Sequence, residues 1–286
     1  MKKKCTKVGC YEPADCRHGK CSQHCRKLHE LQHYNSRKIP KTSAPHLGVE
    51  IEVEFRSQLD LDRALSCSTG HHDGSLSQYS AEFKVLAPTK KAGGKVVRLL
   101  EELWLRRAII STACGIHVHI DVRGISQERL TETFRWLWTT EETWFALVPP
   151  SRRNNSYVKR LVNSRICENH HSWVNHTSYR TLEVRLHGGS VNPHKIQGWI
   201  EAMAVLQSWI YSDNPFPIWE PSHTVPAEGE TIATRPSLIE SNRLFRILYH
   251  DQANLGVQYV NARLACEGVM HDYAFQPREE SLCEMS

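Results

Sequence analysis

The chain lacks the apolar features that direct a protein to a membrane. No stretch approaches the ~18 apolar residues that indicate a membrane span. Met1-Lys2-Lys3-Lys4 has the charge of a signal-peptide start, yet no apolar segment follows it. We therefore expect a cytosolic protein with no membrane partner.

Internal repeats and low-complexity segments are also missing. A length of 286 residues predicts one large domain and something small beside it. With 40% hydrophobic and 23% charged residues, the large domain can bury a sizeable core.

A positive charge excess is absent from most of the chain and confined to its start. Residues 1–41 contain eleven Lys or Arg and three Asp or Glu, a net charge of +8. Because the whole chain carries +5, the remaining residues carry −3. Such a basic segment attracts nucleic acid or another polyanion. The alternative is a solvated basic arm.

Half of the ten cysteines lie in the same segment, between Cys5 and Cys25. Because a cytosolic chain keeps its thiols reduced, the cluster indicates a metal rather than disulfides. Ser22 is a good N-cap and predicts a short helix to about Tyr34. Tetrahedral Zn²⁺ could then take four ligands. Two come from a tight turn, Cys5 and Cys10, and two come from the start of the helix, Cys21 and His24. So short a module buries little core, and the metal would hold it together.

The same segment resembles the short treble-clef-like zinc fingers of many phage and bacterial proteins. The resemblance lies in the Cys-x4-Cys pair, the following Pro13-Ala14, and Gly19-Lys20-Cys21 with its histidine. It implies a bacterial cytoplasm if a phage encodes the chain. Cys16 and Cys25 are spare thiols that could replace a ligand, and the alternative to zinc is a set of reactive thiols.

An acidic strand is expected after a polar, proline-containing linker at residues 35–46. Residues 47–55 alternate apolar and acidic side chains, which places Glu50, Glu52 and Glu54 on one face of a strand. Three like charges in register repel one another, whereas a carboxylate row can hold divalent cations. The alternative is an acidic surface strand.

Three further segments also combine a strand-like pattern with charged or histidine side chains. Asp73-Gly74 predicts a turn, and Glu82 follows in a strand-like stretch that ends at Pro88. Residues 114–121 alternate so that His117, His119 and Asp121 share a face. Residues 179–189 alternate in the same way and present Glu183 and Arg185 together.

Helical periodicity separates these strands. The spacing of apolar residues predicts helices over residues 91–110, 126–148 and 193–211, and a helix-prone tail follows a Pro-rich stretch at 213–236. Strand clusters broken by long helices indicate an α+β class with a mainly antiparallel sheet. We expect a zinc module at 1–34, a catalytic core at 47–212, and an extension at 213–286 that packs on the core.

The ordered motifs resemble those of the amidoligase family, in the carboxylate–amine ligase superfamily that includes glutamine synthetase and glutamate–cysteine ligase. The motifs are Gly48-Val-Glu50-Ile-Glu52, Asp73-Gly-Ser75 with Glu82, Cys114-Gly-Ile-His117-Val-His119, and Leu182-Glu183-Val-Arg185. The resemblance implies a glutamine-synthetase-like catalytic fold. In the glutamine-synthetase pattern an Arg stands two residues before the motif Glu. Here Thr181 takes that position and Arg180 is next to it, so the chain departs from the pattern at one phosphate contact.

The resemblance implies an ATP-dependent ligase that forms an amide or isopeptide bond through an acyl-phosphate. Two or more Mg²⁺ or Mn²⁺ ions and an Arg would offset the repulsion between the substrate carboxylate and ATP. The implied metal ligands are Glu50, Glu52, Glu82, His117 and Glu183. The other implied roles are nucleotide contact for His119, phosphoryl stabilisation for Arg185 with Arg180 beside it, and amine orientation or deprotonation for Asp73.

A polar loop after Pro149-Pro150 adds another candidate. Arg152, Arg153 and Asn154 could hold phosphate or a substrate carboxylate, with Arg153 as the cofactor contact. The alternative is an ordinary basic turn.

Two other classes of protein use the same residue types. A metal-dependent hydrolase or nuclease would act through the carboxylates and histidines without ATP. A nucleic-acid-binding protein could carry an inactive ligase-like domain. The partners are then carboxylate and amine substrates, or a nucleic acid or protein held by the basic zinc module.

Overall fold

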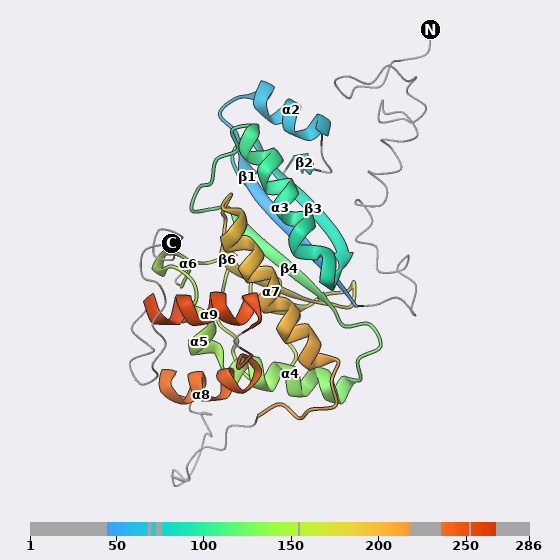
Figure 1. Cartoon of the computed structure of the whole chain (residues 1–286), viewed down its shortest axis with the longest axis vertical. Coiled ribbons are helices and arrows are strands. Elements are labelled where there is room, and N and C mark those ends of the chain that lie inside the picture. Colours follow the sequence, from blue (N-terminus) through green and yellow to red (C-terminus); the bar gives the residue numbers. More distant parts are fainter. Residues whose placement is uncertain are drawn as a thin grey trace. The chain divides into compact units, whose positions relative to one another are not determined.

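The computed structural model describes residues 45–67, 70–72, 76–153, 155–217, 236–251 and 253–266 (Figure 1). These residues form two compact units. The first, here called the sheet unit, holds the described residues up to Asp121 together with Gly188–Gln197. The second, the helix-rich unit, holds Val122–His187 and the described residues from Gly198 onward. The predicted zinc ligands, Asp73 and Asn154 lie outside the described residues.

Four antiparallel strands build the sheet unit: β1 (His46–Glu54), β2 (Gly70–His72), β3 (Ser80–Pro88) and β4 (Gly115–Asp121). Their order is β2-β3-β1-β4, so the acidic strand β1 lies between two neighbours. The apolar side chains of β1, among them Val49 and Ile51, are fully buried. Side chains alternate along a strand, so the acidic residues of β1 share the opposite face.

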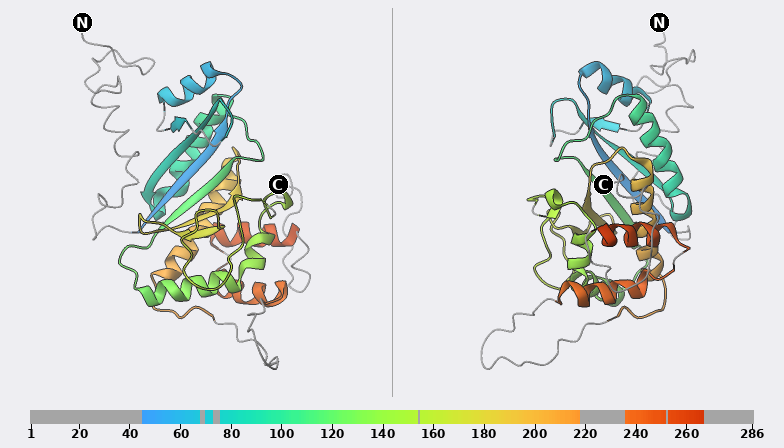
Figure 2. Two further views of the ribbon diagram at one scale, coloured as in Figure 1. Left: turned by 180° about the vertical axis from the view of Figure 1, so that it is seen from behind. Right: turned by 60° about the vertical axis from the view of Figure 1, so that its left-hand side comes forward.

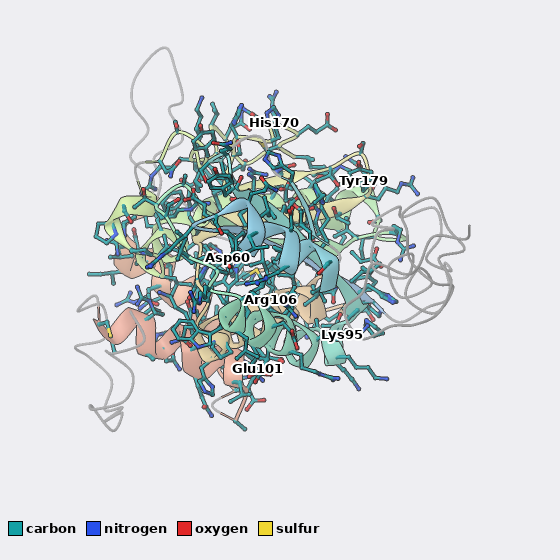
Figure 3. The ribbon with its side chains drawn as sticks, turned by 90° about the horizontal axis from the view of Figure 1, so that it is seen from above. Asp60, Lys95, Glu101, Arg106, His170 and Tyr179 are labelled. Atoms are coloured by element: carbon teal, nitrogen blue, oxygen red, sulfur yellow. The ribbon has the colours of Figure 1, made fainter. Side chains whose placement is uncertain are left out.

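Helix α3 (Thr89–Leu105) packs along β1 and β3 (Figure 1). It presents Val96, Leu100 and Leu103, each at most 1% exposed, at helical spacing. Full burial of one such side chain contributes about 1.5–3 kcal/mol. Lys95 and Glu101, labelled in Figure 3, lie on the exposed side of the helix. The shorter α2 (Gln58–Cys67) contacts β2 and β3.

The helix-rich unit contains one β-hairpin among several helices. The hairpin pairs β5 (Val174–His176) with β6 (Thr181–Gly188). The helices are α4 (Gln127–Thr139), α5 (Glu141–Ala146), α6 (Pro150–Arg153), α7 (Pro193–Ile210), α8 (Leu238–Leu248) and α9 (Leu255–Cys266). Of α7, residues from Gly198 onward belong to this unit.

Local sequence explains where two of these helices begin. The Ser126 hydroxyl accepts a hydrogen bond from the Arg129 amide, which caps α4 as its sequence predicts. At α8, Ser237 and Glu240 form a reciprocal capping box.

An aromatic cluster forms the core of the helix-rich unit. The ring of Trp144 on α5 lies 4.9 Å from Phe245 on α8 and 5.7 Å from Trp173, measured between centroids. Phe245 stacks on Tyr249 at 4.3 Å. The Tyr249 hydroxyl donates a hydrogen bond to the carbonyl of Ala202 on α7. These contacts hold α8 against α5, as Figure 2 also shows.

The observed elements confirm the α+β class, with an antiparallel sheet and the expected long helices. Helix α2 and the short strands β2 and β5 were not predicted, and two predicted segments have a different structure. The helix predicted at 126–148 divides at Thr140 into α4 and α5. The polar loop predicted around Arg152 is the short helix α6, in which Arg152 is only 4% exposed. Across the described ranges, none of the helices has the length and apolar character needed to cross a membrane.

Candidate metal centre

Strand register brings the predicted carboxylates and histidines of the sheet unit onto one face. In the β1–β3 pair, Glu52 lies opposite Glu82 and Glu50 lies opposite Lys84. In the β1–β4 pair, Glu50 also lies opposite His117. Directly opposite residues project to the same side of a sheet, so these side chains converge.

The acidic side chains of β1 are not exposed to solvent, as those of a surface strand would be. Glu50 and Glu52 are each 9% exposed, and His117 is 4% exposed. Burying carboxylates costs free energy unless charge partners or hydrogen bonds compensate. The neighbouring side chains and backbone supply both.

Lys84 is a charge partner shared by two carboxylates. Its Nζ lies 2.7 Å from Glu50 Oε1 and 3.0 Å from Glu82 Oε2. Burial disfavours the ammonium form, but the charges of Glu50 and Glu82 outweigh this effect and raise the pKa of Lys84.

The histidines of β4 are directed at the same carboxylates. His117 Nδ1 and His119 Nε2 each lie 3.5 Å from Glu50 Oε2, and His117 Nε2 lies 3.7 Å from Glu52 Oε1. Although burial opposes ionisation, the interactions of Glu50 with both histidines hold its pKa well below the usual range. Glu50 is therefore the ionised carboxylate at the centre of the cluster.

Glu82 has the opposite electrostatic environment. Burial, followed by the charge of Glu50, raises the pKa of Glu82 to about 8. His71 on β2 lies 2.9 Å from Glu82 Oε2 and covers it from the more exposed side. Two neighbouring carboxyl groups whose pKa values are pushed apart are typical of functional sites.

The backbone orients Glu52. The amide of Gly115 donates a 2.6 Å hydrogen bond to Glu52 Oε2. This contact fixes one carboxylate oxygen and leaves the other facing His117.

These residues fit a divalent cation. One donor atom each from Glu50, Glu82 and His117 lie within 4.8 Å of one another. Carboxylate oxygens with one imidazole suit Mg²⁺ or Mn²⁺ better than the thiolates of a structural zinc site. The face therefore combines hard donors with the ionised carboxylate of Glu50, and both properties favour such an ion.

In the helix-rich unit, β6 places Glu183 and Arg185 side by side, as the alternation predicts. Arg185 Nη1 lies 2.6 Å from Glu183 Oε1, and Asn175 Nδ2 donates to Glu183 Oε2 at 3.0 Å. Glu183 is 6% exposed. The guanidinium of Arg152 donates to the carbonyl of Arg185 at 3.1 Å, which supports the strand from α6. Both oxygens of the Glu183 carboxylate are thus engaged by neighbouring side chains.

The other sequence candidates lie in less distinctive surroundings. Arg180 is exposed, has a φ of 59°, and belongs to the turn between β5 and β6. Arg153 donates to the carbonyls of Val148 and Ala146, so it caps the end of α5. Its guanidinium has a structural use that the sequence did not indicate.

Sequence reasoning missed three residues of this environment: Lys84, His71 and Asn175. Lys84 stands two residues after Glu82, and this spacing already places both on one face. No comparable local signal marks His71 or Asn175, because each meets its carboxylate through strand pairing.

Comparison with known proteins supports the motif resemblance over part of the chain. Residues 58–173, less than half of the chain, match a family model described as "Putative amidoligase enzyme". The matched range includes Glu82, His117 and His119.

A solved structure titled "Apo GmaS without ligand" aligns with a TM-score of 0.43 and 17% identity, covering 84% of this chain and 73% of that one. No curated protein matches. Residues 58–173 are thus similar to the amidoligase family.

Proposed function

We propose that this protein is an ATP- and Mg²⁺-dependent carboxylate–amine ligase. One observation carries the proposal: Glu50, Glu82 and His117 place donor atoms within 4.8 Å on a partly buried sheet face, in a chain whose residues 58–173 are similar to amidoligases. The finer assignments rest on the motif resemblance. These are the acyl-phosphate, the nucleotide contact of His119 and the roles of Glu183, Arg185, Arg180 and Asp73.

The chemistry explains why such a cluster is useful. Amide formation from a carboxylate and an amine is uphill in water, so the carboxylate must first be phosphorylated. Both reactants are anions, and divalent cations held by Glu50, Glu52, Glu82 and His117 would offset their repulsion. The protein's part is to hold these ligands in place, which the register of β1, β3 and β4 supports.

Proton handling is the second requirement. The attacking amine must lose a proton, and a group that accepts it works best with a pKa near the operating pH. Asp73 is our candidate for this role. Arg185 would stabilise the transferring phosphoryl group through its guanidinium.

The test is nucleotide turnover by the full-length chain. We expect Mg²⁺-dependent ADP release that requires both an amine and a carboxylate, screened as panels of each. Glu50→Gln should abolish it, whereas Glu101→Gln on the exposed side of α3 should not. Metal-dependent cleavage of a nucleic acid or peptide with no nucleotide present would instead identify a hydrolase.

A further inference from the structure

Lys84 holds the position between two of the carboxylates that the proposed metal would use. Its ammonium contacts Glu50 Oε1 at 2.7 Å and Glu82 Oε2 at 3.0 Å. Both residues also belong to the donor set with His117. One lysine therefore neutralises part of the charge that makes this face attractive to a divalent cation.

An ammonium and a divalent cation cannot share this space. At separations of a few ångströms, like charges in a partly buried site repel strongly. An oxygen engaged by Nζ also offers fewer lone pairs to a metal. A metal that binds the two oxygens engaged by Nζ, Glu50 Oε1 and Glu82 Oε2, must therefore displace the Lys84 ammonium.

The surroundings of Lys84 allow this displacement. Its side chain is 24% exposed, whereas those of Glu50 and Glu82 are 11% and 13% exposed. Lysine carries a compact charge on a flexible four-carbon stem, so Nζ can reach water while the strand stays in place. His71, whose side chain is 55% exposed, contacts the Glu82 carboxylate from β2 at 2.9 Å.

We propose that Lys84 is a built-in competitor of the divalent cation at the Glu50–Glu82–His117 cluster. It occupies the carboxylates until a metal ion takes its place, and it thereby lowers the affinity of the cluster for free metal. This inference rests on the proposed function only in requiring that the cluster bind a divalent cation.

The experiment measures Mn²⁺ binding to the full-length, nucleotide-free protein by calorimetry and by electron paramagnetic resonance. Lys84→Met removes the charge and keeps much of the side-chain length. We expect it to tighten Mn²⁺ binding roughly tenfold or more, because two hydrogen bonds to charged groups no longer compete. Lys84→Arg keeps the charge and should not tighten binding. Lys95→Met, on the exposed side of α3, is the matched control.

Thermal unfolding provides a second readout. Without metal, Lys84→Met should unfold at a lower temperature than the wild type, because Glu50 loses its cation. Mn²⁺ should raise the midpoint of the variant by more than that of the wild type. Lys84→Gln gives the same comparison if the Met variant does not fold.

The outcomes separate this inference from the proposed function. If Glu82→Gln loses Mn²⁺ binding while Lys84→Met binds no more tightly than the wild type, Lys84 is not a competitor and the metal site stands. If neither the wild type nor Lys84→Met binds Mn²⁺, both proposals are wrong. Binding by Lys84→Met alone would establish the competition in its strongest form.

Discussion

At the scale of single residues, Glu50 and Glu82 show how one sheet face creates two different carboxyl groups. Both lie on neighbouring strands and contact the same lysine. Histidines favour the ionised form of Glu50, whereas burial and the charge of Glu50 favour the protonated form of Glu82. The difference arises from neighbours and not from residue type.

The raised pKa of Glu82 predicts a pH dependence of stability. In the unfolded chain this carboxyl ionises near 4.5, and in the folded protein near 8. Between these values the folded state binds the extra proton, so the free energy of unfolding falls as pH rises. Glu82→Gln removes this contribution.

Unfolding of metal-free protein in chelator, measured from pH 4.5 to 8, checks the prediction. The stability of the wild type relative to Glu82→Gln should decline across this range. Glu101→Gln, an exposed carboxylate on α3, serves as control. A constant difference between wild type and Glu82→Gln would show that Glu82 ionises normally.

Substitution of Glu52 should lower activity without affecting folding. An amide oxygen in Glu52→Gln can still accept the hydrogen bond from Gly115, so the fold should survive. Loss of the negative charge should lower turnover by at least ~10–100-fold, the range seen even for residues behind the metal ligands. Turnover and circular dichroism measured on the same sample test both halves.

Glu54→Gln is the matched control for that variant. Glu54 stands two residues further along β1 and accepts a hydrogen bond from the Ser111 hydroxyl. It is not one of the proposed ligands, so turnover should remain. Wild-type turnover in Glu52→Gln would mean that Glu52 is not part of the metal shell.

At the scale of elements, the capping box of α8 explains why this helix begins at Leu238. Ser237 accepts a hydrogen bond from the Glu240 amide, and the Glu240 carboxylate accepts one from the Ser237 amide. Ser237→Ala should lower the free energy of unfolding by about 1 kcal/mol. Ser208→Ala, at an exposed position inside α7, should be neutral or slightly stabilising. Equal unfolding midpoints in urea for both variants would contradict the capping role.

Local periodicity was sufficient to predict β1, β3, β4, β6 and the long helices, but not the three-residue strands β2 and β5. The alternation at β1 and β4 and the cap at Ser126 depend on residues close in sequence. The division at Thr140 was not predictable, because the next residue, Glu141, is a fully buried carboxylate. It accepts hydrogen bonds from the Leu161 amide and from Trp173 Nε1, both distant in sequence.

The candidate site was also predictable only where it depends on residues close in sequence. Which face each carboxylate occupies follows from a period of two. Which side chains meet across strands depends on register, and register is not visible in a single sequence. The Lys84 bridge and the His71 contact are therefore properties of the pairing between β1, β2 and β3.

At the scale of the whole molecule, the predicted zinc module and the ligase chemistry should be separable. Removal of residues 1–44 leaves Pro45, whose carbonyl accepts hydrogen bonds from Thr89 and so anchors the start of β1. We expect the shortened chain to retain Mg²⁺-ATP turnover on small substrates and to lose salt-sensitive binding of polyanions.

Elemental analysis gives the first part of that test. The full-length chain should contain zinc and the shortened chain none, because Cys5, Cys10, Cys21 and His24 are its predicted ligands. Absence of zinc with free alkylation of Cys5 and Cys10 would exclude the module. Loss of all turnover on shortening would place residues 1–44 in the active site.

If the cluster binds a metal as proposed, the ammonium of Lys84 predicts that folding precedes metal binding. A carboxylate cluster without an internal cation would repel itself, and folding would then depend on the supply of metal. Because Lys84 already pairs with Glu50 and Glu82, we expect the sheet unit to fold without metal and to bind the proposed ion afterwards. Chelators should therefore remove activity without unfolding the protein, unlike a module whose fold requires zinc.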